Sequence, residues 1–208
     1  MVAVKVCGIT NLNDARASLE AGAYALGFNF YSHSPRYIAP LEAARIIQQL
    51  PNSVLAVGVF VNELDSEAIQ TLARTTGIHA VQLHGDESPS FCKSLNDLFV
   101  IKALRVGDGF DPAGAARFET GAILLDALSA GVFGGSGKTL DWTVAARTKE
   151  FVHKLFLAGG LNATNVGQAI QTVQPYAVDV CSGVESAPGR KDPAKLSAFM
   201  EAIQKADK

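Results

Sequence analysis

Residues 154–185, KLFLAGGLNATNVGQAIQTVQPYAVDVCSGVE, alternate between two kinds of segment. Residues 154–158 and 177–180 are short apolar runs, and the segment between them carries Val166, Ile170 and Val173 at helical spacing. An uninterrupted apolar run of this length is typical of a strand that is covered on both faces, as in a parallel sheet. The stretch therefore predicts a strand, a helix and a second strand parallel to the first.

The same alternation extends over the whole chain. Eight apolar runs lie at residues 2–6, 25–28, 54–61, 80–83, 99–103, 122–125, 154–158 and 177–180. Strict alternation gives parallel strands joined by right-handed crossovers. Eight units predict a closed (β/α)8 TIM barrel of the α/β class, formed as a single domain by residues 1–208. A doubly wound open sheet is the alternative, but its GxGxxG fingerprint is absent, because Cys-Gly-Ile-Thr follows Val6.

Helix boundaries can be placed where a capping residue, an apolar face and a terminal glycine or proline agree. These signals predict helices that begin at Asn11, at Pro40, at Ser66, at Asn162 or Thr164, and at Asp192-Pro193; the first three end near Gly22, Pro51 and Gly77. Weaker signals place helices near residues 91–95, 112–118 and 142–152, and Gly114 predicts that the second of these is short or irregular.

The composition limits the classes of function. Hydrophobic residues make up 48% of the chain and charged residues 18%, which excludes a disordered or fibrous protein. The 18 Lys and Arg residues against 20 Asp and Glu residues give a formal net charge of −2. The chain therefore has no bulk basic field for nucleic acid or an anionic membrane, and an anionic ligand must be held by a local site.

The three cysteines, Cys7, Cys92 and Cys181, form neither a disulfide framework nor a CxxC metal motif. The first residues lack the layout of a signal peptide, and the longest apolar run, residues 54–61, is far shorter than the ~18–20 residues of a membrane span. We therefore expect a cytoplasmic protein with free thiols and no membrane or nucleic-acid partner. Size predicts a monomer, and a homodimer stays open.

In (β/α)8 barrels the functional residues lie at the carboxyl ends of the strands. Polar residues and glycines gather at these ends in the predicted barrel: Cys7, Asn29, Asn62, His84, Arg105, Asp126, Gly159-Gly160, Asp179 and Ser182-Gly183. The glycine pair follows the seventh strand, and Ser182 with Gly183 follows the eighth, where such barrels bind phosphate. Glycine lets backbone N–H groups approach phosphate oxygens, so we predict a phosphate site there; two tight turns are the alternative.

Two ionisable side chains indicate proton transfer. Cys7 ends the first strand, and Lys5, on the same strand face roughly 6–7 Å away, could stabilise its thiolate. A lysine inside a barrel strand needs a partner, for which we expect the carboxylates of Asp126 and Asp179. Asp126 ends an apolar run, where its carboxyl group is partly removed from water. This raises the pKa of the carboxyl group and suits it to donate a proton. The alternative is that Asp126 only caps a turn. An acid and a base on opposite sides form the layout of an isomerase that moves a proton.

Three further features belong to the predicted loops. Arg36 could bind a carboxylate through its planar guanidinium, or could be a solvated loop residue. His84 could contact a ligand, or could be a satisfied histidine at a strand end. Four glycines within residues 131–137 predict a mobile loop that could act as a lid. This loop resembles a P-loop only in ending Gly-Lys-Thr, and a Walker site needs a doubly wound sheet, so nucleotide hydrolysis is excluded.

With these residues placed, the chain resembles the phosphoribosylanthranilate isomerase family of tryptophan biosynthesis. The matching motifs run from the first strand to the last helix: Lys5-Val-Cys7-Gly-Ile-Thr10, Gly27-Phe-Asn-Phe30, Ser34-Pro-Arg36-Tyr37, Gly58-Val-Phe-Val-Asn62, Val81-Gln-Leu-His-Gly-Asp86, Asp126, Gly134-Gly-Ser-Gly137, Asp141-Trp142, Leu157-Ala-Gly-Gly-Leu161, Asp179, Ser182-Gly-Val-Glu185, Pro188-Gly189 and Asp192. The chain departs from the family at Cys181, where serine is usual, at Ser136, where threonine is common, and at Leu140, where phenylalanine is common.

The resemblance implies an Amadori rearrangement of N-(5-phosphoribosyl)anthranilate, a small phosphosugar, to its 1-deoxyribulose 5-phosphate isomer. It implies that Asp126 is the general acid that opens the ribose ring and that Cys7 is the general base that removes the C2 proton. The remaining positions implied to bind substrate are Arg36 for the anthranilate carboxylate, Asp179 for the ribose, Lys5 and His84 beside them, and Gly159, Gly160, Ser182 and Gly183 for the phosphate. The substrate nitrogen supplies its own lone pair, so no metal, flavin or nicotinamide cofactor is implied.

Two other functions stay open at this point. The related isomerase of histidine biosynthesis has aspartate in place of Cys7 and a two-fold repeat with two phosphate sites, whereas here only the second half carries a glycine pair. A non-catalytic phosphate-binding module on the same barrel would tolerate loss of Cys7 or Asp126, and both are present.

Overall fold

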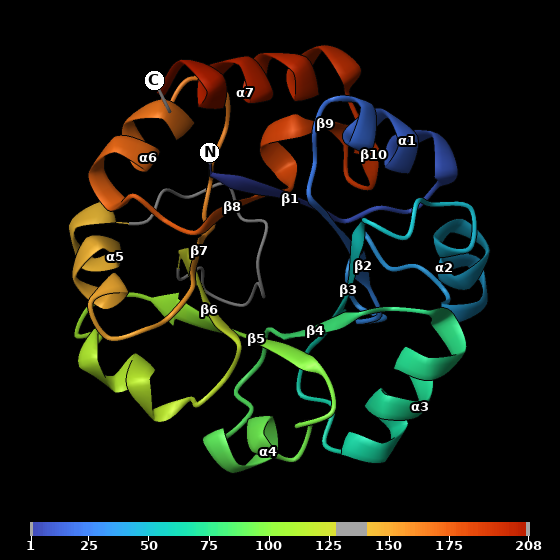
Figure 1. The fold of residues 1–208 in the computed structure, drawn as a ribbon, viewed down its shortest axis with the longest axis horizontal. Coiled ribbons are helices and arrows are strands. Elements are labelled where there is room, and N and C mark those ends of the chain that lie inside the picture. The colour runs from blue at the N-terminus through green and yellow to red at the C-terminus, as the bar shows by residue number, and fades with distance from the viewer. Residues whose placement is uncertain (1, 128–140, 207–208) are drawn as a thin grey trace.

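The computed structural model describes residues 2–127 and 141–206. Eight parallel strands close into one barrel in the order β1 to β8, and β1 is hydrogen-bonded to both β2 and β8. The helices surround this barrel on the outside (Figure 1). The predicted (β/α)8 TIM barrel is confirmed.

The barrel strands are β1 (Ala3–Cys7), β2 (Ala25–Asn29), β3 (Leu55–Phe60), β4 (Ala80–Leu83), β5 (Phe99–Val106), β6 (Ala122–Ala127), β7 (Leu155–Leu157) and β8 (Ala177–Val180). The outer elements are α1 (Leu12–Glu20), α2 (Pro40–Ile47), α3 (Ser66–Thr76), α4 (Pro89–Lys93), the 3-10 helix η1 (Ala113–Arg117), α5 (Trp142–Lys149), α6 (Val166–Val173) and α7 (Pro193–Ala206). Every predicted strand overlaps an observed one, and the segment around Gly114 is the short 3-10 helix η1.

Most predicted helix starts are confirmed by their caps. The Asn11 side chain accepts a hydrogen bond from the Asp14 amide at 2.9 Å, and Asp192 caps α7. The predicted start of α3 at Ser66 is confirmed, whereas the start of α6 was predicted wrongly. Asp65, one residue before Ser66, caps α3, because its carboxylate accepts from two amides of the first turn. Asn165 takes the cap position of α6 with no side-chain cap, because the Asn162 side chain is engaged earlier, with the backbone amide of Thr164.

The core has two layers, one on each side of the barrel wall. The inner cluster consists mainly of small side chains and fills the barrel: Ala25, Val57, Ala80, Ile101, Ala103, Ala122, Leu124, Phe156, Ala158 and Ala177. The outer cluster lies between the strands and the helices and includes Phe28, Ile69 and Phe199. Successive strand residues enter alternate layers, and both layers are dry. This explains why the strands form continuous apolar runs.

The chain after β8 forms short elements that the sequence did not predict. They are the 3-10 turn η2 (Ser182–Val184) and an antiparallel hairpin of β9 (Glu185–Ala187) and β10 (Arg190–Lys191). The Lys191 amide donates to Asp14 Oδ2 at 2.8 Å, and Thr10 Oγ1 donates to the Gly189 carbonyl at 2.6 Å. The hairpin therefore joins the end of the barrel to the loop after β1.

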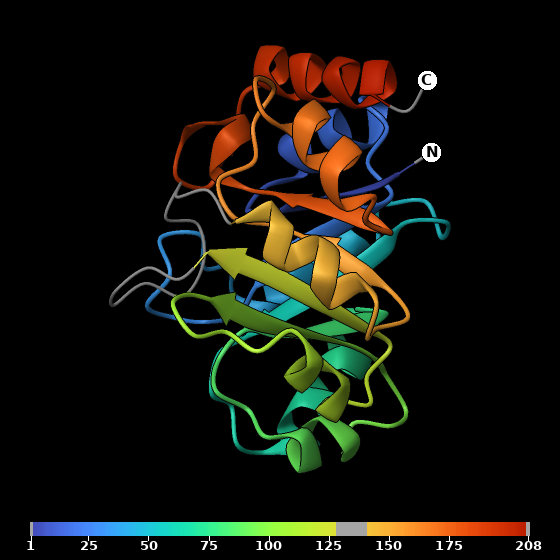
Figure 2. The same cartoon turned by 90° about the vertical axis from the view of Figure 1, so that its left-hand side faces the viewer.

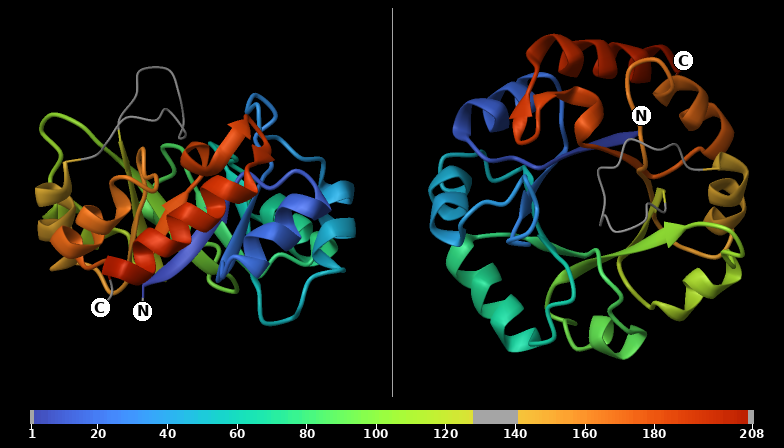
Figure 3. Two further views of the ribbon diagram at one scale, coloured as in Figure 1. Left: turned by 90° about the horizontal axis from the view of Figure 1, so that it is seen from above. Right: turned by 180° about the vertical axis from the view of Figure 1, so that it is seen from behind.

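The strands point toward one side of the molecule, where the segments after β2 and β8 also lie (Figure 2). The start of β1 and the end of α7 lie together at the opposite end of the barrel (Figure 3). The geometry therefore concentrates the strand-end residues at one mouth of the barrel, away from both ends of the described chain.

Candidate active site

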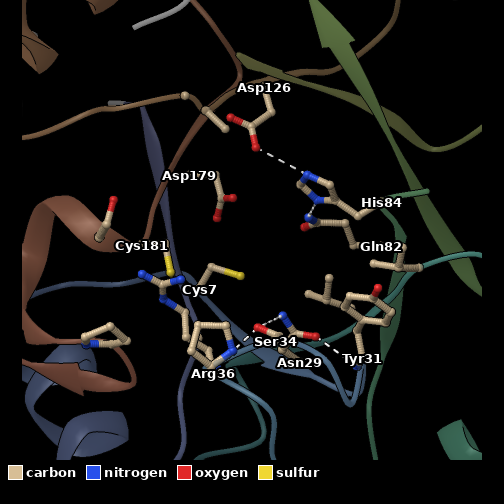
Figure 4. Close-up of a pocket in the computed structure, with 18 of the residues that line it drawn as sticks. Cys7, Asn29, Tyr31, Ser34, Arg36, Gln82, His84, Asp126, Asp179 and Cys181 are labelled. Atoms are coloured by element: carbon tan, nitrogen blue, oxygen red, sulfur yellow. Dashed lines mark hydrogen bonds and ion pairs between the residues drawn. The ribbon is translucent and has the colours of Figure 1, made fainter. Parts of the chain in front are cut away.

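A cavity of about 570 Å³ opens at the carboxyl ends of the strands. Most of the predicted site residues line it: Cys7, Arg36, His84, Asp126, Gly159, Gly160, Asp179 and Ser182. Two predicted site residues do not line the cavity. Lys5 is fully buried. Gly183 packs against the Leu161 carbonyl. Figure 4 shows the side chains converging from strands that are far apart in the sequence. The barrel thus brings the predicted site residues to one place.

Lys5 pairs with one of its two expected partners. Its Nζ lies 2.8 Å from Asp179 Oδ1, because the two residues are register neighbours on β1 and β8. The expected pairing with Asp126 was wrong, since that carboxylate on β6 turns toward the Ala127 amide and His84. Burial opposes the lysine charge, but Asp179 and Cys7 together raise the pKa of Lys5. Burial also raises the pKa of Asp179, to about 7, against the opposing pull of Lys5.

The Cys7 thiol lies among groups that favour its ionised form. Cys181 hydrogen-bonds to it, and this bond together with the charges of Lys5 and Lys191 outweighs burial and lowers the pKa of Cys7. The same bond and burial raise the pKa of Cys181, which keeps its proton. Lys5 was the predicted neighbour of this thiol; Cys181 and Lys191 were missed as its partners. These surroundings therefore favour the thiolate form of Cys7.

Lys5→Met is expected to raise the pKa of Cys7, because a positive charge that favours the thiolate is lost. A thiolate base works above its pKa, so the acidic limb of the kcat/KM profile should move to higher pH. Turnover at pH 7 should then fall by about one to two orders of magnitude. The measurements are the pH profile and the pH dependence of iodoacetamide labelling of Cys7.

The exposed Lys93 supplies the matched control, since Lys93→Met removes the same charge far from the cavity. This variant should leave both profiles unchanged. A Lys5→Met protein that folds, melts cooperatively and keeps both wild-type profiles would show that Lys5 does not tune the thiol.

Asp126 lies across the cavity from Cys7 (Figure 4). Its Oδ1 accepts from the Ala127 amide at 2.8 Å, and its Oδ2 lies 3.3 Å from Nε2 of His84. The amide nitrogen of Gln82 lies 2.7 Å from Nδ1 of the same imidazole, so Gln82 and Asp126 lie at opposite nitrogens of the ring. Gln82 was missed by the sequence analysis, although a polar residue at an inward position of an otherwise apolar strand is a readable signal.

Arg36 is held by a carboxylate that was not predicted to be its partner. Its Nε lies 2.9 Å from Glu185 Oε1 and its Nη2 lies 2.7 Å from Glu185 Oε2, in a bidentate pair. Glu185 also accepts from Lys191 Nζ at 2.9 Å and from the Gly189 amide at 3.2 Å. The hairpin after β8 therefore fixes one edge of the guanidinium and leaves the rest of Arg36 on the cavity wall.

The predicted phosphate loops are tight and leave no room for side chains. Gly159 and Gly160 have φ of +83° and +65°, the left-handed region that favours glycine. A Cβ on Gly159 would lie 2.8 Å from the Ala127 amide nitrogen, and one on Gly183 would lie 2.0 Å from the Leu161 carbonyl oxygen. These glycines therefore let the ends of β6, β7 and η2 approach one another around the cavity.

Three sequence predictions concern a lid, a bound metal ion and a membrane partner. The proposed lid at residues 131–137 lies outside the described residues. Within residues 2–127 and 141–206, no group of three or more His, Cys, Asp or Glu side chains is arranged to hold a metal ion. No helix in the described part of the chain has the length and apolar character needed to cross a membrane.

A closed (β/α)8 barrel with ionisable and glycine residues around a cavity at its carboxyl-end mouth defines the class of barrel enzymes. Residues 4–202 match the family model described as N-(5'phosphoribosyl)anthranilate (PRA) isomerase. The chain belongs to this family of isomerases.

Individual relatives agree over the whole chain. The N-(5'-phosphoribosyl)anthranilate isomerase of Trichlorobacter lovleyi is 49% identical, with 99% of this chain and 100% of the relative covered. The crystal structure of the Thermotoga maritima enzyme is 44% identical and superposes with a TM-score of 0.92, covering 99% of this chain and 100% of that chain. A phosphoribosyl anthranilate isomerase solved with reduced 1-(o-carboxyphenylamino)-1-deoxyribulose 5-phosphate is 43% identical, with a TM-score of 0.89 and the same coverage.

Proposed function

We propose that the chain catalyses the Amadori rearrangement of N-(5-phosphoribosyl)anthranilate to 1-(2-carboxyphenylamino)-1-deoxyribulose 5-phosphate, as a step of tryptophan biosynthesis. The observation that carries the proposal is the placement of Cys7 and Asp126 on opposite walls of one cavity. The relative that binds a reduced form of the same product supports the choice of substrate. In this proposal Asp126 is the general acid and Cys7 is the general base.

The first step opens the ribose ring. Asp126 gives its proton to the ring oxygen while the lone pair of the anthranilate nitrogen forms a double bond to C1, and the bond between C1 and the ring oxygen breaks. The product of this step is a Schiff base. The Ala127 amide donates to one oxygen of this carboxylate, and His84 Nε2 lies 3.3 Å from the other.

The second step moves hydrogen from C2. The Cys7 thiolate removes the C2 proton, and the electron pair moves through C1 to the nitrogen, giving an enolamine that tautomerises to the ketone. The neighbouring Cys181 hydrogen bond, Lys5 and Lys191 lower the pKa of Cys7, which favours its ionised form. The substrate nitrogen serves as the electron sink, and the step requires no cofactor.

The two ends of the substrate are held apart from the reacting carbons. The loops of Gly159-Gly160 and Ser182-Gly183 supply backbone N–H groups for the phosphate, which suits a chain with a net charge of −2. Arg36, oriented by Glu185, takes the anthranilate carboxylate. Asp179, paired with Lys5, faces the ribose hydroxyls.

Gly183→Ala tests the phosphate end. A Cβ there collides with the Leu161 carbonyl oxygen, so η2 must move and Ser182 with it. We expect KM for the substrate and Ki for inorganic phosphate to rise about tenfold or more, with a smaller change in kcat. Gly167→Ala on α6 is the control, because the added Cβ meets nothing closer than 3.7 Å. A folded Gly183→Ala protein with unchanged KM and Ki would move the phosphate elsewhere.

The proposed reaction is tested by mixing the purified protein with freshly prepared phosphoribosylanthranilate and following the loss of its fluorescence. Rapid loss with formation of the carboxyphenylamino deoxyribulose phosphate is expected. Turnover of only the histidine-pathway phosphosugar would assign the related isomerase activity instead. A folded protein that binds inorganic phosphate and converts neither compound would be a binding module.

A further inference from the structure

Two free thiols lie side by side at the mouth of the barrel. Cys7 ends β1, and Cys181 directly follows β8. These strands are parallel neighbours with Val6 opposite Val180, so Cys7 and Cys181, which follow these two residues in the chain, lie beside one another. Neighbouring strands lie about 4.7–4.9 Å apart, which is within the Cα separation of about 4.4–6.8 Å that a disulfide spans.

The backbone around the pair leaves space for both sulfur atoms. A Cβ on Gly8 would lie 3.0 Å from Cys181 Sγ, and a Cβ on Gly27 would lie 2.8 Å from Cys7 Sγ. Because both neighbours are glycines, the sulfurs occupy volume that side chains would otherwise fill. Both cysteines line the same cavity (Figure 4), so a small oxidant that enters the cavity meets them together.

The pKa values of the two thiols are shifted in opposite directions. Lys191 Nζ lies 2.6 Å from the Cys7 carbonyl oxygen and 3.9 Å from Cys181 Sγ. The pKa of Cys7 is lowered, with the Cys181 hydrogen bond as the largest cause, and the pKa of Cys181 is raised. A thiolate next to a protonated thiol is the arrangement in which one sulfur reacts with an oxidant and the other resolves the product.

We propose that Cys7 and Cys181 form a peroxide-sensitive dithiol that closes reversibly into a disulfide across the mouth of the barrel. The Cys7 thiolate attacks one oxygen of the peroxide; an S–O bond forms, the O–O bond breaks, and the departing oxide takes up a proton to leave as water or an alcohol. Cys181 then attacks the resulting sulfenic acid; the S–S bond forms, the S–O bond breaks, and the Cys181 proton leaves with the hydroxide as water. Two thiols are oxidised and one peroxide is reduced.

The effect of this bond on turnover rests on the proposed function of Cys7 as the base, whereas formation of the bond does not. A disulfide removes the thiolate and draws the Cys7 sulfur toward β8, away from the reacting carbon. The enzyme is then expected to lose turnover in step with disulfide formation and to recover when a dithiol reductant restores both thiols.

The experiment treats the full chain with hydrogen peroxide and maps its peptides without reduction. We expect a cross-linked pair of peptides that contain Cys7 and Cys181, with loss of two hydrogens, and more than tenfold loss of turnover that dithiothreitol reverses. Cys92→Ala, which removes the third thiol from the outer core, should behave as the wild type does. Cys181→Ser should give no cross-link and should instead accumulate a Cys7 sulfenic acid that dimedone traps.

Other peptide maps overturn the proposal. Oxidation of Cys7 to sulfinic acid with Cys181 left reduced would show that the second thiol does not resolve the first. A cross-link through Cys92, or one between two chains, would assign the oxidation to other thiols. A Cys7–Cys181 bond that leaves turnover unchanged supports the dithiol and refutes Cys7 as the base, so the two proposals fail separately.

Discussion

Asp126→Asn should lower kcat by about 10³- to 10⁴-fold without unfolding the protein, because the side chain keeps its shape but cannot donate a carboxylic proton. The amide oxygen can still accept from the Ala127 amide at the position now held by Oδ1. KM should change little, since Asp126 is assigned to the reacting ring oxygen and not to either end of the substrate. The measurement is steady-state turnover of phosphoribosylanthranilate, with circular dichroism to establish the fold.

The control for this variant is Asp97→Asn, which makes the same change at an exposed carboxylate between α4 and β5. It should retain wild-type turnover. If Asp126→Asn keeps more than about a tenth of the wild-type kcat, the general acid is another group, and His84 is then the first residue to examine because its Nε2 faces the same point of the cavity.

Cys7→Ala is expected to lower kcat by a comparable factor, about 10³-fold or more, because no other described side chain is assigned to remove the C2 proton. Phosphate binding should survive, since the Cys7 side chain is not assigned to the phosphate. Iodoacetamide should inactivate the wild type in parallel with alkylation of Cys7, and bound product should protect it. The readouts are single-turnover kinetics and the inhibition constant of inorganic phosphate.

Cys92→Ala is the matched control for the thiol. Cys92 is buried in the outer core, and burial raises its pKa to about 11, so it is expected to react slowly and to contribute nothing to turnover. Full activity in Cys7→Ala would keep the reaction and reassign the base, with Asp179 as the neighbouring candidate.

The strand–helix alternation was sufficient to predict the barrel because each strand is dry on both faces. Each strand therefore appears as a mainly apolar run, and helices such as α1 and α7 begin at residues whose side chains cap them. The β9–β10 hairpin was missed for the converse reason. Its two strands have three and two residues, too short for any periodicity, and they are held by contacts to Thr10 and Asp14 at the other end of the chain.

The sequence was sufficient to predict which residues lie around the cavity, but not which side chains pair with one another. Strand-end position was enough to place Cys7, Asp126 and the glycine loops on one cavity. Which carboxylate Lys5 meets depends on barrel closure, which puts β1 beside β8 and not beside β6. Arg36 and Glu185 are 149 positions apart and pair only after the hairpin docks, so local sequence signals could not reveal the bond.

Closure between β1 and β8 also sets the order in which the chemistry becomes possible during synthesis. Cys7 is synthesised before Asp179, Cys181 and Lys191, which all follow it by more than 170 positions. Until these residues dock, Cys7 has Lys5 on its own strand but neither the Lys191 charge nor the Cys181 thiol that favour its ionised form. A chain that stops before β8 therefore lacks Cys181 and Lys191, two of the three groups that favour the Cys7 thiolate, and only docking of β8 beside β1 completes the set.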